Sequence, residues 1–179
     1  MKKNKVVILF LTKFFVVYFL LTGLYSVYLN NTQEKGTIFE CSPVTKIVAN
    51  HSEQVANFLG YNIYTDQSSQ ELSIMVMVHQ NYVVKIVEGC TGISVMILFL
   101  AFIIAFSGSM KNTILFGIFG LIFIYLTNIF RIITLSLTMY HYPQYEEVMH
   151  SVFFPAAIYG MVFLLWIIWV NKFAIINKK

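Results

Sequence analysis

The stretch VEGCTGISVMILFLAF, Val87–Phe102, sets an acid, two glycines and a thiol directly against a long apolar run. Hydrophobic residues make up 58% of the 179-residue chain and charged residues only 11%, which lies outside the range of soluble globular domains. The composition therefore indicates a membrane protein. The quoted stretch marks a point where a polar segment meets the bilayer.

Four apolar runs are candidates for membrane-spanning helices. About 20 helical residues, at ~1.5 Å rise each, cross a ~30 Å hydrocarbon core. The runs are Val6–Leu29, Cys90–Phe106, Thr113–Tyr140 and Val152–Val170. The first is too long for a secretory signal and no small-x-small cleavage pattern follows it, so it is predicted to stay as an anchor. We expect an all-α transmembrane helix bundle of about four spans, forming a single membrane-embedded domain over residues 1–179.

The lysines predict the orientation of this bundle, because basic residues are retained preferentially on the cytoplasmic side. With the N-terminus inside, the inner segments carry no acid, and their basic residues are Lys2, Lys3, Lys5, Lys111, Lys172, Lys178 and Lys179. All eight acids then fall outside, which agrees with the lysine placement. Both termini are therefore predicted to be cytoplasmic. The net charge of +4 forms no basic patch, so nucleic acid is not an expected partner.

The polar segment between the first two runs, Asn30–Glu88, is the only part long enough to fold outside the bilayer. Its stretch SPVTKIVANHSEQVANFLG, Ser42–Gly60, predicts one amphipathic helix with a serine cap, a proline at the first position and a glycine at the end. Two β-branched runs follow, Ile74–Val78 and Tyr82–Val87, separated by polar residues. They predict a β-hairpin whose second strand delivers the chain to Cys90.

Three unusual polar residues are predicted at one depth in the membrane. Cys90 begins the second helix at its outer end. The third helix rises from the inside, so Arg131, 18 residues after Thr113, lies roughly 27 Å along it, close to the outer boundary. His150 lies just before the fourth helix re-enters from outside. A thiol, a guanidinium and an imidazole thus share one plane, although depth alone does not make them neighbours.

The three groups suit thiol acyl-transfer chemistry. A cysteine at a helix N-terminus near a cation has its thiolate stabilised, and the thiolate is the nucleophile. The imidazole of His150 can act as general base and acid, because imidazole titrates near neutrality. The Arg131 guanidinium can stabilise the oxyanion that forms when a thiolate attacks a carbonyl, or hold the substrate backbone. The sequence therefore predicts a candidate catalytic site of Cys90, Arg131 and His150.

Each of these residues also has a structural interpretation. A lone membrane cysteine is usually a packing residue, an arginine near a helix end often extends to the headgroups, and a histidine before a helix is often interfacial. Glu88 is most simply a solvated acid, although it could orient a partner, and Gly92 could serve only close helix packing. A disulfide between Cys41 and Cys90 is chemically feasible in an oxidising compartment, but it would consume the nucleophile, so a structural or incidental Cys41 is favoured.

The four histidines and two cysteines are the candidate metal ligands. No pair of them has a recognised zinc spacing, and HSEQ, which begins at His51, is not His-Glu-x-x-His. We expect neither a metal nor any other cofactor.

The motifs around these residues resemble the exosortase/archaeosortase family of membrane-embedded cysteine transpeptidases, and in particular its short members. The stretch GCTGIS, Gly89–Ser94, resembles the family's Cys-[Ser/Thr]-Gly motif. The stretch NIFRI, Asn128–Ile132, resembles its Asn-x-x-Arg-Ile motif. The stretch HSVFFPAAIYG, His150–Gly160, is similar to the His-led entry into the last helix. The resemblance covers the chain from about Ile74 to Tyr159.

The resemblance implies that Cys90 is the nucleophile, Arg131 the catalytic arginine and His150 the catalytic histidine. The supporting candidates are Glu88, Gly92, Asn128 and His141. His141 competes with His150 for the histidine role, and His150 is preferred because it abuts the final helix as the family's histidine does. Members of the family cleave C-terminal sorting tails made of a short motif, a transmembrane helix and basic residues, and they transfer the substrate to an acceptor.

The expected function is that of a cysteine protease or transpeptidase working through a thioester acyl-enzyme, which an amine acceptor or water can resolve. The expected partners are exported proteins with C-terminal transmembrane sorting tails, the lipid bilayer and a membrane partner protein, since four spans are fewer than the larger exosortases have. The expected location is a bacterial inner membrane, with the site facing the periplasm or exterior. The alternative is a non-catalytic membrane subunit that assists protein export or assembly.

Overall fold

A computed structural model describes residues 2–34, 36, 39–106 and 108–173. The two lysines at 178 and 179, predicted to be cytoplasmic, lie outside the described residues. The helices are α1 (Lys2–Thr32), α2 (Pro43–Phe58), α3 (Ile93–Ala105), α4 (Met110–His141), α5 (Glu146–Val148) and α6 (Phe154–Lys172). The strands are β1 (Ile63–Gln67), β2 (Ile74–Val78) and β3 (Asn81–Ile86). Short 3-10 turns cover Glu88–Cys90 and Pro143–Tyr145, and a π-helical turn covers Met149–Phe153.

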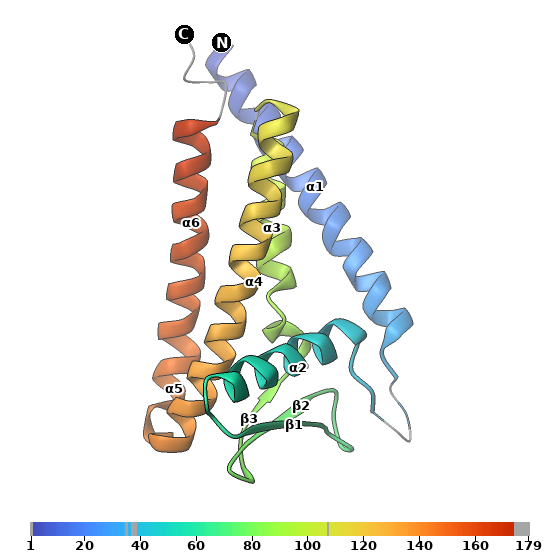
Figure 1. Cartoon of the computed structure of the whole chain (residues 1–179). Helices are drawn as coiled ribbons and strands as arrows, with labels where there is room; N and C mark the ends of the chain where they lie inside the picture. The colour runs from blue at the N-terminus through green and yellow to red at the C-terminus, as the bar shows by residue number, and fades with distance from the viewer. Residues whose placement is uncertain (1, 35, 37–38, 107, 174–179) are drawn as a thin grey trace.

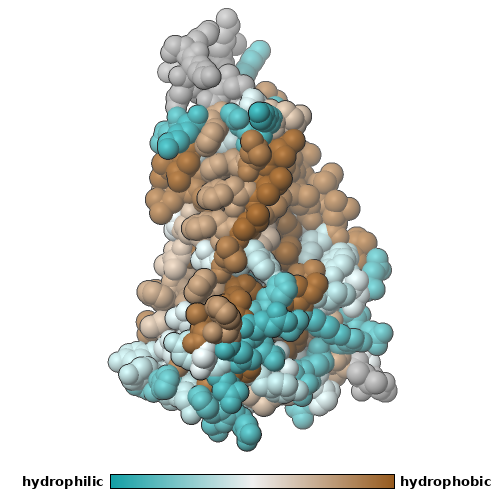
Figure 2. Space-filling view, viewed as in Figure 1, coloured by the Kyte–Doolittle hydropathy of each residue, from teal (hydrophilic) through white to brown (hydrophobic). Residues whose placement is uncertain are grey.

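Helices α1, α3, α4 and α6 form a bundle, and α2 lies across one end of it beside the sheet (Figure 1). The start of α1 and the end of α6 are both at the opposite end of the bundle (Figure 1). Apolar side chains cover the bundle, whereas hydrophilic side chains gather over α2 and the strands, which we call the polar cap (Figure 2). The polar cap is the segment that composition predicted to fold outside the apolar runs.

In the described part of the chain, three helical segments are long and apolar enough to cross a membrane: Lys5–Thr32, Met110–His141 and Pro143–Lys172. The predicted second span is shorter than expected. Helix α3 has 13 residues, about 20 Å at ~1.5 Å each, against a ~30 Å hydrocarbon core. The predicted run loses its first residues to the Glu88–Cys90 turn and to Gly92, whose left-handed φ of 81° interrupts the helical backbone. Three spans are therefore supported by length, and a fourth crossing at α3 stays a prediction.

The predicted amphipathic helix and hairpin are both present in the polar cap. The Ser42 hydroxyl caps α2 by accepting from the Thr45 backbone N–H at 3.4 Å. Strands β2 and β3 form the hairpin, joined through His79 and Gln80, whose φ values of 49° and 67° are typical of the two central residues of a type I′ turn.

Strand β1 was missed because its only buried apolar residue is Ile63, so its sequence lacks an alternating pattern. It pairs antiparallel with β2, which gives the order β1-β2-β3.

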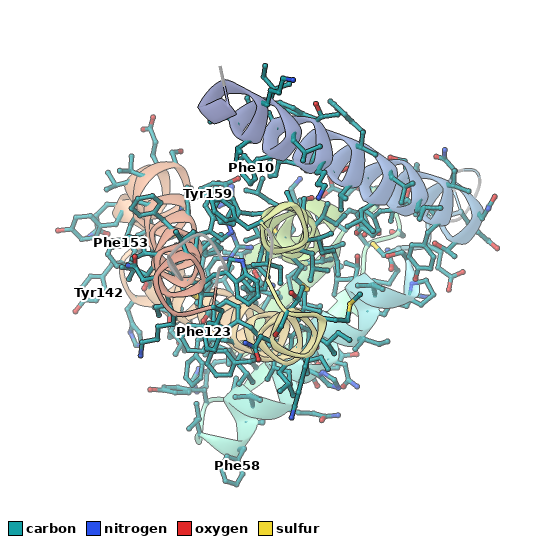
Figure 3. All side chains as sticks on the ribbon, turned by 90° about the horizontal axis from the view of Figure 1, so that it is seen from above. Phe10, Phe58, Phe123, Tyr142, Phe153 and Tyr159 are labelled. Carbon is teal, nitrogen blue, oxygen red and sulfur yellow. The ribbon has the colours of Figure 1, made fainter. Side chains whose placement is uncertain are left out.

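Two apolar clusters hold these parts together, and α4 belongs to both. The first joins the polar cap to α4, and its buried residues include Val48, Ala49, Val76, Ile86, Ile129, Ile132 and Ile133. The second joins α3, α4 and α6, and it includes Phe99, Phe116, Val162 and Trp169. Gly120 allows the close approach of α3 to α4, since a Cβ there would lie 2.1 Å from the Phe99 ring. Helix α1 packs on α3, and Phe10 of α1, labelled in Figure 3, contacts Phe106, the residue after α3, with ring centroids 4.7 Å apart. Helix α4 therefore connects the polar cap to the apolar bundle.

Candidate active site

A cavity of about 300 Å³ lies between β3, α4 and the chain that leads into α6. Cys90, Arg131 and His150 all line it, and we call it the Cys90 cavity. The three residues come from the turn after β3, from α4 and from the π-helical turn before α6. The fold thus brings together side chains for which the sequence predicted only a common depth. The remaining wall is largely apolar, with Lys85 and Glu146 as its other charged residues.

The sequence predicted Cys90 at the start of a helix, but the residue lies in a turn. It ends the 3-10 turn Glu88–Cys90, and α3 begins only at Ile93, after the left-handed Gly92. The helix dipole acts within the first turn of a helix. Cys90 precedes that turn, so the predicted placement of this thiol on a helix N-terminus is wrong. Its side chain is partly exposed within the cavity wall.

Two side chains of α4 hold the backbone of Cys90. The Asn128 side-chain amide donates from Nδ2 to the Cys90 carbonyl oxygen at 2.8 Å, and Arg131 donates from Nη2 to the same oxygen at 3.2 Å. Residues three apart on a helix lie on one face, so both reach the same atom. Arg131 therefore points into the site and does not extend toward the lipid headgroups. Within the described part of the chain, the buried Nε of Arg131 and Oδ1 of Asn128 have no hydrogen-bond partner.

Both the backbone conformation at residue 92 and its close packing against Asn128 require a glycine at this position. Its φ of 81° is a conformation that residues with a Cβ adopt at a cost, and a Cβ built there would lie 3.2 Å from Cγ of Asn128. Any larger residue at 92 would press on the amide that holds the Cys90 carbonyl. The motif Cys-Thr-Gly thus has a geometric reason for its glycine in this chain.

Glu88 faces α2 and is not a solvated acid. Its carboxylate accepts from the Ser42 N–H and hydroxyl, both at 3.0 Å, and from the Thr45 hydroxyl at 2.6 Å. Burial by itself would raise the pKa of Glu88, but the hydrogen bonds from Thr45, Gln33 and Ser42 outweigh it and lower this pKa below its usual value. Glu88 therefore ties the turn that carries Cys90 to the start of α2.

We expect Glu88→Gln to lower the free energy of unfolding by about 1.5–3 kcal/mol near neutral pH, because the hydrogen bonds from Ser42 and Thr45 lose their part-buried charged acceptor. The folded pKa of Glu88 is lower than the unfolded pKa, so its contribution is complete above the unfolded value, about 4.3, and is lost as the pH falls through the folded value. In thermal unfolding in detergent, the variant should thus have a lower midpoint temperature than wild type at pH 7, and the two midpoints should converge in acid. The exposed Glu147 provides the control, since Glu147→Gln should change stability little at either pH. A difference that does not change with pH would contradict this role of the carboxylate.

His150 and His141 occupy different surroundings. His150 lies in the π-helical turn Met149–Phe153, an element often found at functional sites, and lines the Cys90 cavity. His141, at the end of α4, is exposed, as is His150, and its ring packs near Tyr140 with centroids 5.0 Å apart. His141 is not part of the cavity wall.

Sequence reasoning missed two parts of the cavity wall. Glu146 was predicted to be a solvated acid, and it is exposed, but it also lines the cavity together with His150. Its spacing of four residues from His150, one helical turn, was the signal that could have indicated this. The residues of β3 that line the cavity had no such signal, because their position depends on how the sheet packs against α4.

The sequence profile of the transmembrane exosortase family matches residues 5–170 of the chain. The match covers α1 through most of α6, and so includes every element that lines the Cys90 cavity. Comparisons with curated proteins and with solved structures give no match.

Proposed function

The chain belongs to the transmembrane exosortase family, and from this premise we propose that it is a membrane-embedded thiol enzyme that cleaves the C-terminal sorting tails of exported proteins. The observation that carries the proposal is the cavity shared by Cys90, Arg131 and His150. This cavity brings together a thiol, a guanidinium and an imidazole, which would serve as nucleophile, oxyanion stabiliser and proton carrier. Those are the three groups that acyl transfer through a thioester requires.

In the proposed reaction, His150 takes the proton of the Cys90 thiol, and the thiolate attacks the scissile carbonyl carbon. The new C–S bond moves an electron pair onto the carbonyl oxygen, beside the Arg131 guanidinium. When this oxyanion collapses, the C–N bond breaks and His150 returns the proton to the leaving amine. An acceptor amine or water then attacks the thioester, loses its proton to His150 and releases the thiolate. The same residues serve both transpeptidation and hydrolysis.

We propose that the site faces outward from a bacterial inner membrane, with both ends of the chain in the cytoplasm. The lysine placement supports this orientation. The polar cap also lies at the end of the bundle opposite the start of α1 and the end of α6 (Figures 1 and 2). The partners would be exported proteins with a C-terminal transmembrane tail, and a membrane protein that completes the substrate groove.

Mass spectrometry of membrane proteins that carry such tails tests the proposed function. Cells with the chain should contain shortened proteins, and cells without it should accumulate the uncleaved forms. Identical spectra from the two cell types would reject cleavage by this chain.

Arg131→Lys separates an enzyme from a non-catalytic subunit. We expect the variant to accumulate normally and to process tails ~10²–10³-fold more slowly, as when one oxyanion donor is lost. Lysine keeps the charge, but it lacks the planar guanidinium that can hold the Cys90 carbonyl with one N–H group and offer others to the substrate. Lys172→Arg, on the last turn of α6, is the control and should leave processing unchanged. Wild-type turnover by Arg131→Lys would favour the non-catalytic alternative.

A further inference from the structure

The free edge of β3 forms one wall of the Cys90 cavity. Strand β3 is the last strand of the sheet and pairs only with β2. Five consecutive residues, 82–86, line the cavity. The register against β2 shifts at Val83, which forms a β-bulge between the pairs Met77–Tyr82 and Val76–Val84. After the bulge, residues 84–86 alternate between the two faces of the sheet and still all line the cavity, so the cavity lies along the edge of the strand, where the backbone is accessible.

The backbone groups of this edge are available to a ligand. In a two-residue type I′ hairpin, the residues that flank the turn, Val78 and Asn81, form a hydrogen-bonded pair. The next pair, Met77 and Tyr82, is then a non-hydrogen-bonded pair, so the Tyr82 N–H and C=O point away from β2. Among the described residues, no hydrogen bond joins the backbone of residues 82–86 to a group outside the sheet.

The same edge leads directly to the proposed nucleophile. Strand β3 ends at Ile86, and the turn Glu88–Cys90 follows it without a break. Arg131 of α4 and His150 of the π-helical turn line the same cavity. A peptide lying along β3 would therefore have its backbone beside the edge and one of its carbonyl groups near Cys90.

We infer that the segment to be cleaved binds as an extended strand added to the free edge of β3. The inference rests on the proposed function and names the conformation in which that site takes its substrate. Unpaired N–H and C=O groups on an edge recognise the backbone of an extended peptide, while side-chain pockets supply sequence preference. A helix cannot bind in this way, because its backbone groups are already paired. The scissile segment is therefore extended where it passes Cys90, and the transmembrane helix of the tail begins only after this segment.

Tyr82→Pro, compared with Tyr82→Ala, tests the backbone contact. Both variants lose the phenol ring, but only proline loses the N–H that faces the cavity. Proline at this position removes no hydrogen bond to β2, because that N–H does not point toward β2. We expect tail processing by Tyr82→Pro to be at least ~10-fold slower than by Tyr82→Ala, the effect of about one hydrogen bond. Labelling of Cys90 by a maleimide checks that both variants fold, and equal processing by two folded variants would overturn the inference.

Cross-linking measures the binding mode without catalysis. The variant Cys41→Ala, Cys90→Ala, Tyr82→Cys has one thiol, since the chain has only two cysteines. The partner is a membrane protein of the same cell, chosen for its C-terminal tail sequence. A series of its variants would each carry one cysteine, placed at successive positions of the segment before its transmembrane helix. Disulfide yield should alternate with a period of two, as in a strand.

A period of three to four residues, or no dependence on position, would overturn the inference. The dependence of disulfide yield on cysteine position can be interpreted whether or not the wild-type chain cleaves this tail. Alternation without wild-type cleavage would keep the binding mode and reject the enzyme. Wild-type cleavage without alternation would reject the binding mode alone.

Discussion

Replacing Cys90 by alanine is expected to abolish tail cleavage while the protein still accumulates in the membrane. Without the thiol no thioester forms, so neither the transpeptidation nor the hydrolysis route can begin. The fold around the site should persist, because Asn128 and Arg131 hold the carbonyl oxygen of residue 90, a backbone atom that alanine retains. The measurement is the fraction of tail-bearing membrane proteins that stay uncleaved. Undiminished cleavage by Cys90→Ala would remove the cysteine-enzyme proposal.

Cys41 is the matched control for this experiment. It is 1% exposed in the first apolar cluster, and the Gln67 side-chain amide donates to its sulfur at 3.6 Å. Burial raises the pKa of the Cys41 thiol, which disfavours its reactive thiolate. Cys41→Ala should keep most activity. A membrane-impermeant maleimide added from outside should label Cys90 and not Cys41, and the absence of labelling at Cys90 would contradict the proposed outward-facing site.

Substituting His150 by glutamine should slow processing by ~10²–10⁴-fold, the usual contribution of general acid–base catalysis. Glutamine keeps a polar side chain of similar reach, but its amide cannot carry a proton between the thiol and the leaving amine. His141→Gln is the matched control, because His141 is exposed like His150 but lies beside the ring of Tyr140 and does not line the Cys90 cavity. It should process tails at close to the wild-type rate. Rates would be followed in single-turnover assays with a purified tail-bearing protein in detergent.

The reverse result, a large loss with His141→Gln and none with His150→Gln, would move the proton carrier to the end of α4. Loss in both variants would indicate damage to the segment between α4 and α6. Cys90 labelling separates these cases, because a collapsed site changes the access of the maleimide to Cys90. Loss of processing with normal labelling is the result that supports a chemical role for the histidine.

Features that depend on neighbouring residues could be predicted from the sequence. The cap and proline at the start of α2 are contacts within one turn of chain, and the β2–β3 hairpin follows from two β-branched runs around a short polar turn. The common depth of Cys90, Arg131 and His150 follows from helix rise, which is nearly constant along a chain. Strand β1 and the short α3 were not predictable in this way. Strand β1 lacks a pattern, and the start of α3 depends on a left-handed glycine that fits against Asn128.

The sequence alone determined the class of protein, its long apolar helices and the candidate residues for thiol chemistry. Only the tertiary structure placed Arg131 and His150 on the wall of one cavity with Cys90, left His141 outside it, turned Glu88 toward α2 and set the edge of β3 beside the thiol. Depth along a helix is one-dimensional and follows from counting residues. Lateral position depends instead on which helix faces pack together and on how the chain turns at Gly92 and at Met149–Phe153, and no local periodicity encodes those choices.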